Sequence, residues 1–128
     1  MNRYEYTIMR KRVGNGTGED FTAKNPKAVS EYIKGLWMNH DQMHVFVLYL
    51  DIKNKIIGHS LVAKGLPNRA PLRCREVYRG AILASACSVI VASNHPSNMT
   101  EPSSEDINCA KTLLDAGFLL GIPLVDFI

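Results

Sequence analysis

The run of apolar residues from Val45 to Leu50 constrains the fold of this chain more than any other feature. It has the length of a strand and lacks the polar alternation of a strand with one face in water, so both of its faces should be covered. Residues 51–55 then turn the chain, and Ile56 to Ala63 is predicted to return as the second strand of a hairpin. A strand covered on both faces needs helices from elsewhere in the sequence.

The rest of the chain supplies them. Asn25 and Pro26 are residue types preferred at a helix cap and first turn, and the apolar spacing after them is helical to about Met38. The other predicted elements are a strand over 4–13, a turn over 14–18, a helix over 75–86, a buried strand over 88–92, a helix over 103–116 closed by Gly117, and a last strand within 119–128. In the second helix the predicted apolar stripe is Val77, Tyr78, Ala81, Ile82 and Leu83. This order predicts one α/β domain over residues 1–128, a mixed sheet with flanking helices.

Composition narrows the class of protein. The 128 residues suffice for one sizeable core, and 46% hydrophobic with 21% charged residues is ordinary for a globular protein. No apolar run approaches the roughly 20 residues of a membrane span, and the first residues lack the apolar segment of a signal peptide. Cys74, Cys87 and Cys109 form no C-x-x-C pair, so no disulfide framework or zinc knuckle is indicated. These features predict a cytoplasmic protein without membrane contact.

The net charge of +3 permits contact with nucleic acid but does not argue for it. Basic residues cluster at positions 10–12 and again at Arg69, Arg73, Arg75 and Arg79. Arg75 and Arg79 are four residues apart and share a face if their segment is helical. Two interpretations stay open for the second cluster: a solvated surface, or a surface that contacts phosphate groups.

Candidate catalytic chemistry follows the predicted strand over 88–92, in the segment Ser93-Asn94-His95-Pro96-Ser97 and the later Ser103-Ser104-Glu105-Asp106. One zinc-hydrolase signature has two histidines one residue apart and an aspartate about ten residues later. Ser93 stands where the first histidine should be. The main question is therefore whether the chain is an enzyme or has kept only the scaffold of one.

These segments, with Ala116-Gly117, Leu120-Gly121-Ile122 and Asp126, resemble the RadC family, a branch of the JAB/MPN (JAMM) metalloprotease-like fold. Similar residues also occur upstream, at Leu48-x-Leu50-Asp51, Gly65, Asn68 and Arg75-Glu76-Val77. The resemblance covers about residue 25 to the end. It implies a JAB/MPN, cytidine-deaminase-like architecture, and it makes a role associated with DNA repair or mobile elements conceivable by analogy.

In that family two histidines and an aspartate hold Zn²⁺, a serine hydrogen-bonds beside the metal-bound water, and an upstream glutamate is the general acid and base. By resemblance His95 and Asp106 are residual metal ligands, and Ser103 is the water-binding serine. Ser93 replaces the third ligand. Met43 replaces the glutamate, and if the alignment shifts, Asp41 is the nearest carboxylate. The expected cofactor is therefore none, or weakly bound zinc.

The same residues also fit roles that need no metal, and both readings stay open. Ser103 and Asp106 match a helix cap, and His95 matches a loop held by hydrogen bonds. His44, His59 or a cysteine could fold into the place of the missing histidine. Near the C-terminus Asp126 is present, but Phe127 stands where RadC-like chains commonly carry histidine.

Three functions are compatible with this sequence. The first is a RadC-like domain that has lost zinc-dependent hydrolysis and acts by binding or regulation, through a protein partner or self-association. The second is an active or weakly active zinc-dependent peptidase or isopeptidase with a substituted ligand. The third is a nucleic-acid-binding module that uses Arg69, Arg73, Arg75 and Arg79.

Overall fold

A computed structural model describes residues 1–7, 9–12, 22–23, 25–34, 36, 43–65, 72–93 and 104–127. The elements in chain order are α1 (Pro26–Lys34), β1 (Met43–Leu50), β2 (Ile56–Gly65), α2 (Cys74–Leu83), β3 (Ser88–Ser93), α3 (Ser104–Leu120) and β4 (Leu124–Phe127). No helix within these ranges is long and apolar enough to cross a lipid bilayer.

The four strands form one sheet in the order β2-β1-β3-β4. Strand β1 is antiparallel to both β2 and β3, whereas β4 is parallel to β3. The predicted mixed sheet with flanking helices is thus confirmed. Strands β1 and β3 are central, and the side chains from His44 to Leu50 and throughout β3 are buried, as the apolar run from Val45 required.

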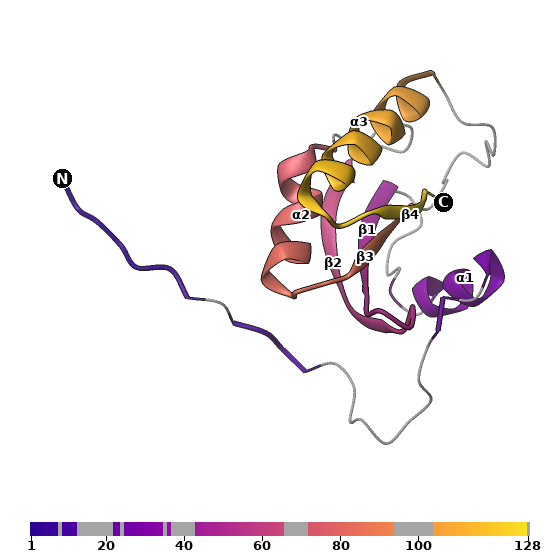
Figure 1. Ribbon diagram of the computed structural model, residues 1–128, viewed down its shortest axis with the longest axis horizontal. Helices are drawn as coiled ribbons and strands as arrows, with labels where there is room; N and C mark the ends of the chain where they lie inside the picture. The colour runs from indigo at the N-terminus through magenta and orange to yellow at the C-terminus, as the bar shows by residue number, and fades with distance from the viewer. Residues whose placement is uncertain are drawn as a thin grey trace.

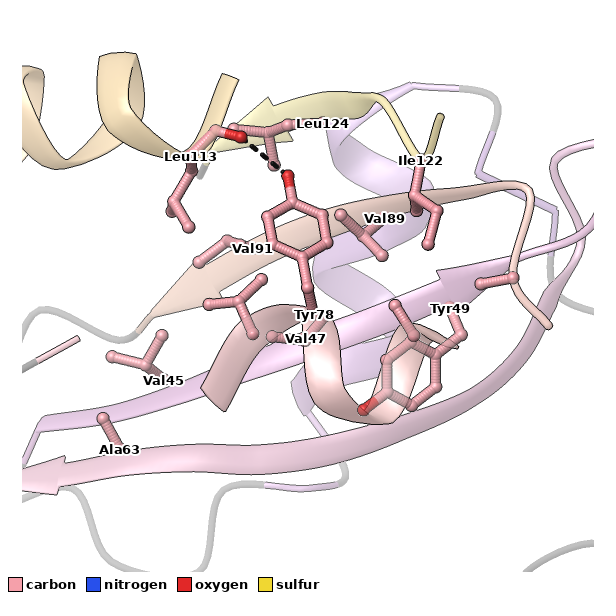
Figure 2. Close-up of a cluster of buried hydrophobic side chains, with 13 residues drawn as sticks. Val45, Val47, Tyr49, Ala63, Tyr78, Val89, Val91, Leu113, Ile122 and Leu124 are labelled. Atoms are coloured by element: carbon pink, nitrogen blue, oxygen red, sulfur yellow. Dashed lines mark hydrogen bonds between the residues drawn. The ribbon is translucent and has the colours of Figure 1, made fainter. Parts of the chain in front are cut away.

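Helices cover both faces of the sheet, with α2 and α3 on one side and α1 on the other (Figure 1). Alternation along β1 divides its side chains between two cores. The larger core lies under α2 and α3 and includes Val45, Val47, Tyr49, Val77, Tyr78, Val89, Val91 and Leu113, most of which Figure 2 labels. The smaller core lies under α1 and consists of Val29, Ile33, Phe46, Leu48, Leu50, Ile90 and Ala92.

Local polar contacts fix the helix start and the hairpin turn. The Asn25 side-chain oxygen accepts a 2.9 Å hydrogen bond from the Ala28 amide, which confirms the predicted cap of α1. In the turn between β1 and β2, Oδ1 of Asp51 accepts bonds from the amides of Lys53 and Lys55, at 2.8 and 2.9 Å. Asn54 has a φ of 62°, a conformation that asparagine tolerates better than most residues. These contacts fix the turn that joins the two strands.

The predicted N-terminal strand is wrong for the residues that the structure describes. Residues 1–7 and 9–12 have no regular secondary structure, and Tyr4, Tyr6 and Met9 are 71%, 89% and 92% exposed. An alternating pattern forms a strand only when another strand supplies hydrogen-bond partners, and nothing in the described sheet pairs with this segment. The predicted turn over 14–18 lies outside the described residues.

Three helix ends differ from the prediction. Helix α1 ends at Lys34 rather than near Met38, and Leu36 is already in a turn. Helix α2 ends at Leu83, and Ile82 and Leu83 are 53% and 47% exposed, so the buried stripe is Val77, Tyr78 and Ala81 alone. The chain leaves the helix through Ser85, whose φ is 55°. The apolar spacing of the last turn suggested a buried face, but Ile82 and Leu83 lie on the exposed side of the helix.

Helix α3 does not end at Gly117 but continues to Leu120. Gly121, with a φ of 73°, ends it instead, and the Ile122 amide donates a 2.9 Å bond back to the Gly117 carbonyl. This is the usual glycine C-cap arrangement. Gly117 is needed for a different reason, which is its close approach to the Tyr78 side chain of α2.

Candidate functional site

The ends of several elements converge at one end of the sheet. Met43 begins β1 opposite Gly65, the last residue of β2, and Ser93 ends β3 opposite Val45. Helix α2 runs into β3 through a short turn, so its first turn points back toward the end of β3. Helix α3 follows β3 and leads into the parallel strand β4, so it also starts at this end. Two helix N-termini and three strand ends therefore surround this region, which we call the site end.

Ser93 is the predicted site residue that the structure defines best. It is the last residue of β3 and is 8% exposed. Residues Val89 and Val91 of the same strand pack in the larger core, so alternation directs Ser93 to the face covered by α2 and α3. The predicted strand and its end in the candidate motif are both confirmed. The site end thus carries a buried hydroxyl at the position matched to the first histidine.

The two histidines that the structure describes, His44 and His59, lie on the opposite face of the sheet from Ser93. His59 contacts Tyr32 of α1 through a 2.7 Å hydrogen bond at its Nδ1 atom and lies edge-on to Phe46. His44 is 6% exposed and, by alternation in β1, shares the face of Phe46. The β-sheet therefore separates both imidazoles from the face of Ser93. Neither imidazole therefore shares the face of Ser93, the position matched to the missing histidine.

The cysteines divide differently. Cys74 and Cys109 are partly buried against the larger core, on the face of Ser93, whereas Cys87 is exposed at the opposite end. Cys74 is the first residue of α2 and so lies at the site end. Across the described segments, no three His, Cys, Asp or Glu side chains are close enough to hold a metal ion. Cys74 and Cys109 thus share a face with Ser93, and Cys87 does not.

Glu76 is a carboxylate in the first turn of α2, at the site end. Its Oε2 atom is inaccessible to solvent and has no hydrogen-bond partner among the described residues. A buried polar atom of this kind is unusual, because desolvating it without a hydrogen bond is costly. Nothing in the sequence could reveal this, since acidic residues in a first helical turn are ordinarily explained by the helix dipole.

The predicted basic surface is described in part. Arg73 precedes α2, and Arg73, Arg75 and Arg79 are all exposed. Arg75 and Arg79 lie one helical turn apart, so they share a side of α2 as predicted. Their exposure fits a solvated surface and a phosphate-contacting surface equally. Arg69 lies outside the described residues.

The remaining predicted residues are less completely defined. His95, Ser103, Asp41 and Asn68 lie outside the described residues, and for Met43 and Asp106 the backbone alone is described. Asp106 is in the first turn of α3, where its backbone is at the site end. Near the C-terminus, Phe127 packs against the larger core, and the Asp126 side chain accepts a 2.8 Å bond from the Phe127 amide. Phe127 thus has a packing role.

The mixed sheet has helices on both faces, and β3 ends two residues before His95 in the sequence. This architecture is consistent with the class of JAB-type α/β domains. The RadC-like JAB domain family matches residues 23–128, and this chain belongs to that family.

The chain is similar to proteins from several organisms that carry the name UPF0758. It is 33% identical to the UPF0758 protein of Chlorobaculum tepidum over 120 residues, which cover 94% of this chain and 54% of that protein. It is 36% identical to the UPF0758 protein of Caldanaerobacter subterraneus over 111 residues, which cover 87% of this chain and 48% of that protein. It is 37% identical to the UPF0758 protein of Chlorobium chlorochromatii over 100 residues, which cover 78% of this chain and 45% of that protein. The chain spans about half the length of these relatives.

Proposed function

We propose that this RadC-like JAB domain has lost zinc-dependent hydrolysis and acts as a binding or regulatory module. The observation that carries the proposal is Ser93, a buried hydroxyl at the end of β3 where the family's motif has its first histidine. A neutral hydroxyl is a poor zinc ligand beside an imidazole nitrogen or a carboxylate. The matched residues, His95 and Asp106 with Ser93, therefore do not fit a zinc site with three strong protein ligands.

The second support comes from the position of the general base. Met43 is the first residue of β1. By the resemblance it stands in the place of the family's glutamate, and a thioether cannot exchange a proton with water. Loss of a general acid or base typically costs about 10² to 10⁴ in rate. With a metal ligand and the general base both replaced, the domain would act through its fold and its exposed surfaces rather than through catalysis.

Metal analysis of protein purified without a chelator tests this proposal. We expect substoichiometric zinc, no shift in unfolding temperature on adding zinc, and no change in either result for His95→Ala. Near-stoichiometric zinc that disappears in His95→Ala would contradict the proposal and favour the alternative of an active peptidase or isopeptidase with a substituted ligand. Because the relatives are about twice as long, the assay should also be run on the chain as it occurs in the cell.

A second candidate function is nucleic-acid binding, with an association to DNA repair or mobile elements as the family resemblance suggests. It is compatible with the exposure of Arg73, just before α2, and of Arg75 and Arg79, one turn apart on that helix. Binding through phosphate contacts should weaken steeply as salt increases, and Arg75→Ala with Arg79→Ala should reduce that salt dependence. Absence of DNA or RNA binding at low salt would eliminate this candidate.

A further inference from the structure

The outer face of α3 is an exposed surface with a regular pattern. Ile107, Leu114 and Phe118 are 47%, 50% and 88% exposed, and their spacing of seven and four residues places them on one side of the helix. Lys111 and Asp115 are exposed between them on the same side. Leu113 and Gly117 point the other way, into the molecule. We call these five exposed residues, from Ile107 to Phe118, the α3 outer face.

The order of residues on the α3 outer face is complementary to itself. In an antiparallel pair of identical helices with a two-fold axis at the level of Leu113, Lys111 lies opposite the partner's Asp115 and Asp115 opposite the partner's Lys111. The same axis brings Ile107 near the partner's Phe118, and it places the two copies of Leu114 next to each other. Apolar side chains therefore contact apolar side chains, and the two charged residues of each helix form two pairs of opposite charge with those of the partner.

We propose that the α3 outer face binds the same face of a second copy of this chain in antiparallel orientation. The exposure of Phe118 gives the reason for an occupant, since a phenyl ring 88% exposed on a helix loses contact with water when it is covered. The charge pattern gives the reason for a second copy, since an antiparallel copy offers an opposite charge to both Lys111 and Asp115. This contact goes beyond the proposed function and is independent of whether the domain binds zinc.

The size of the surface predicts a weak dimer. From Ile107 to Phe118 the helix rises about 16 Å, so a single helix face is available to each protomer. That area is smaller than the roughly 800 Å² per partner of a standard stable interface. We therefore expect a dissociation constant of roughly 1 to 100 µM, with exchange between monomer and dimer.

Sedimentation equilibrium from about 5 to 500 µM measures this association directly. The wild-type chain should shift from monomer to dimer, and Phe118→Glu should raise the dissociation constant by about tenfold or more. Ile52→Glu is the matched control, because Ile52 is 85% exposed in the turn between β1 and β2 and lies outside the α3 outer face. It should leave the dissociation constant unchanged. Circular dichroism should confirm that each variant folds, as expected for substitutions at exposed positions.

Charge reversals test the orientation. Lys111→Asp and Asp115→Lys should each weaken self-association about fivefold, because each creates two like-charge pairs across the axis. An equal mixture of the two variants should associate as tightly as wild type, since every opposed pair is again of opposite sign. The two residues are also four apart within each helix, so in the mixture each helix carries like charges at these positions while the charges between copies are again opposite.

Several results would overturn the self-association. One is a wild-type chain that stays monomeric over the whole concentration range, which would leave the surface to another partner. Others are a dimer that Phe118→Glu does not weaken, or one that Ile52→Glu weakens equally. A mixture of the charge-reversed variants that associates no better than either alone would overturn the antiparallel arrangement.

Discussion

The hydroxyl of Tyr78 in α2 donates a 2.8 Å hydrogen bond to the backbone carbonyl of Leu113 in α3, within the larger core (Figure 2). Burial, and secondly the neighbouring Cys74, raise the pKa of Tyr78, so this hydroxyl keeps its proton and remains a donor. Gly117 lies one turn after Leu113 on the same side of α3. A Cβ atom at Gly117 would lie 2.5 Å from the Tyr78 Oη and 2.5 Å from the carbonyl oxygen of Ile122. The contact between α2 and α3 thus requires glycine at position 117.

Gly117→Ala should destabilise the domain even though alanine is the better helix former. Intrinsic propensity favours alanine by about 1 kcal/mol. We expect the steric overlap with Tyr78 and Ile122 to outweigh this gain, for a net loss of roughly 1–3 kcal/mol in the free energy of unfolding. Urea denaturation measures the change. Asn108→Ala, on the exposed side of the same helix, is the control and should be neutral or stabilising. A Gly117→Ala variant more stable than wild type would contradict this account of the helix crossing.

The role of Gly117 illustrates where sequence reasoning about this fold stops. The strand from Val45 and the strand from Ser88 were predictable, because continuous apolar runs of that length have few alternatives. A glycine near the end of a helical pattern can serve either as a cap or as a point of close approach. The choice here depends on Tyr78, which is 39 positions away in sequence and is brought near by packing. The prediction of an N-terminal strand was wrong for a related reason, since an alternating pattern forms a strand only beside another strand that pairs with it.

In the candidate site, too, some features were predictable from the sequence and others depend on tertiary packing. The position of Ser93 at a strand end followed from the pattern of the chain, and the structure confirms it. The face on which His59 lies depends on the register of β1 and β2, which shifts twice along their length. No sequence pattern gives those shifts, so the sequence could not exclude His59 as a substitute ligand. The burial of Glu76 is likewise a result of tertiary packing.

The Tyr32–His59 contact predicts that stability falls as the solution is acidified. Burial lowers the pKa of His59 below its ordinary value, so the unfolded chain binds a proton at this site at higher pH than the folded chain does. Stability contributed by the neutral imidazole is present above the unfolded pKa of about 6.5 and is lost as pH falls from there toward the folded pKa. Urea denaturation between about pH 7.5 and pH 5.5 should show this loss.

His59→Gln should make the same pH profile flatter than that of wild type, since glutamine cannot take up the proton. Tyr32→Phe, which removes the 2.7 Å hydrogen bond, should cost about 1 kcal/mol at neutral pH. Because the chain has four histidines, the informative quantity is the difference between the wild-type and variant profiles. Identical slopes would show that His59 does not contribute to the pH dependence.

Glu76→Gln should leave the domain equally stable or make it more stable. The Oε2 atom of Glu76 is buried without a donor among the described residues, so a neutral amide of the same shape should be less costly to desolvate than a charged carboxylate. We expect a change in unfolding temperature of zero to about +5 °C. Glu76→Ala is the comparison that removes the packing as well. A clear loss of stability in Glu76→Gln would show that the carboxylate accepts a hydrogen bond and has a structural role.

Ser93→His should strengthen zinc binding if Ser93 occupies the place of the family's first histidine. The new imidazole would add a third strong donor to His95 and Asp106, and we expect the affinity for zinc to rise by about tenfold or more. Ser88→His is the matched control, because Ser88 is equally buried at the other end of β3, 6% exposed, far from the candidate motif. A zinc titration followed by the shift in unfolding temperature measures the affinity of both variants. The unfolding temperature in the presence of a chelator gives the loss of stability caused by the larger side chain alone. Adding His95→Ala should abolish the gain. No gain in Ser93→His, or an equal gain in Ser88→His, would show that the match between this strand end and the zinc motif is wrong.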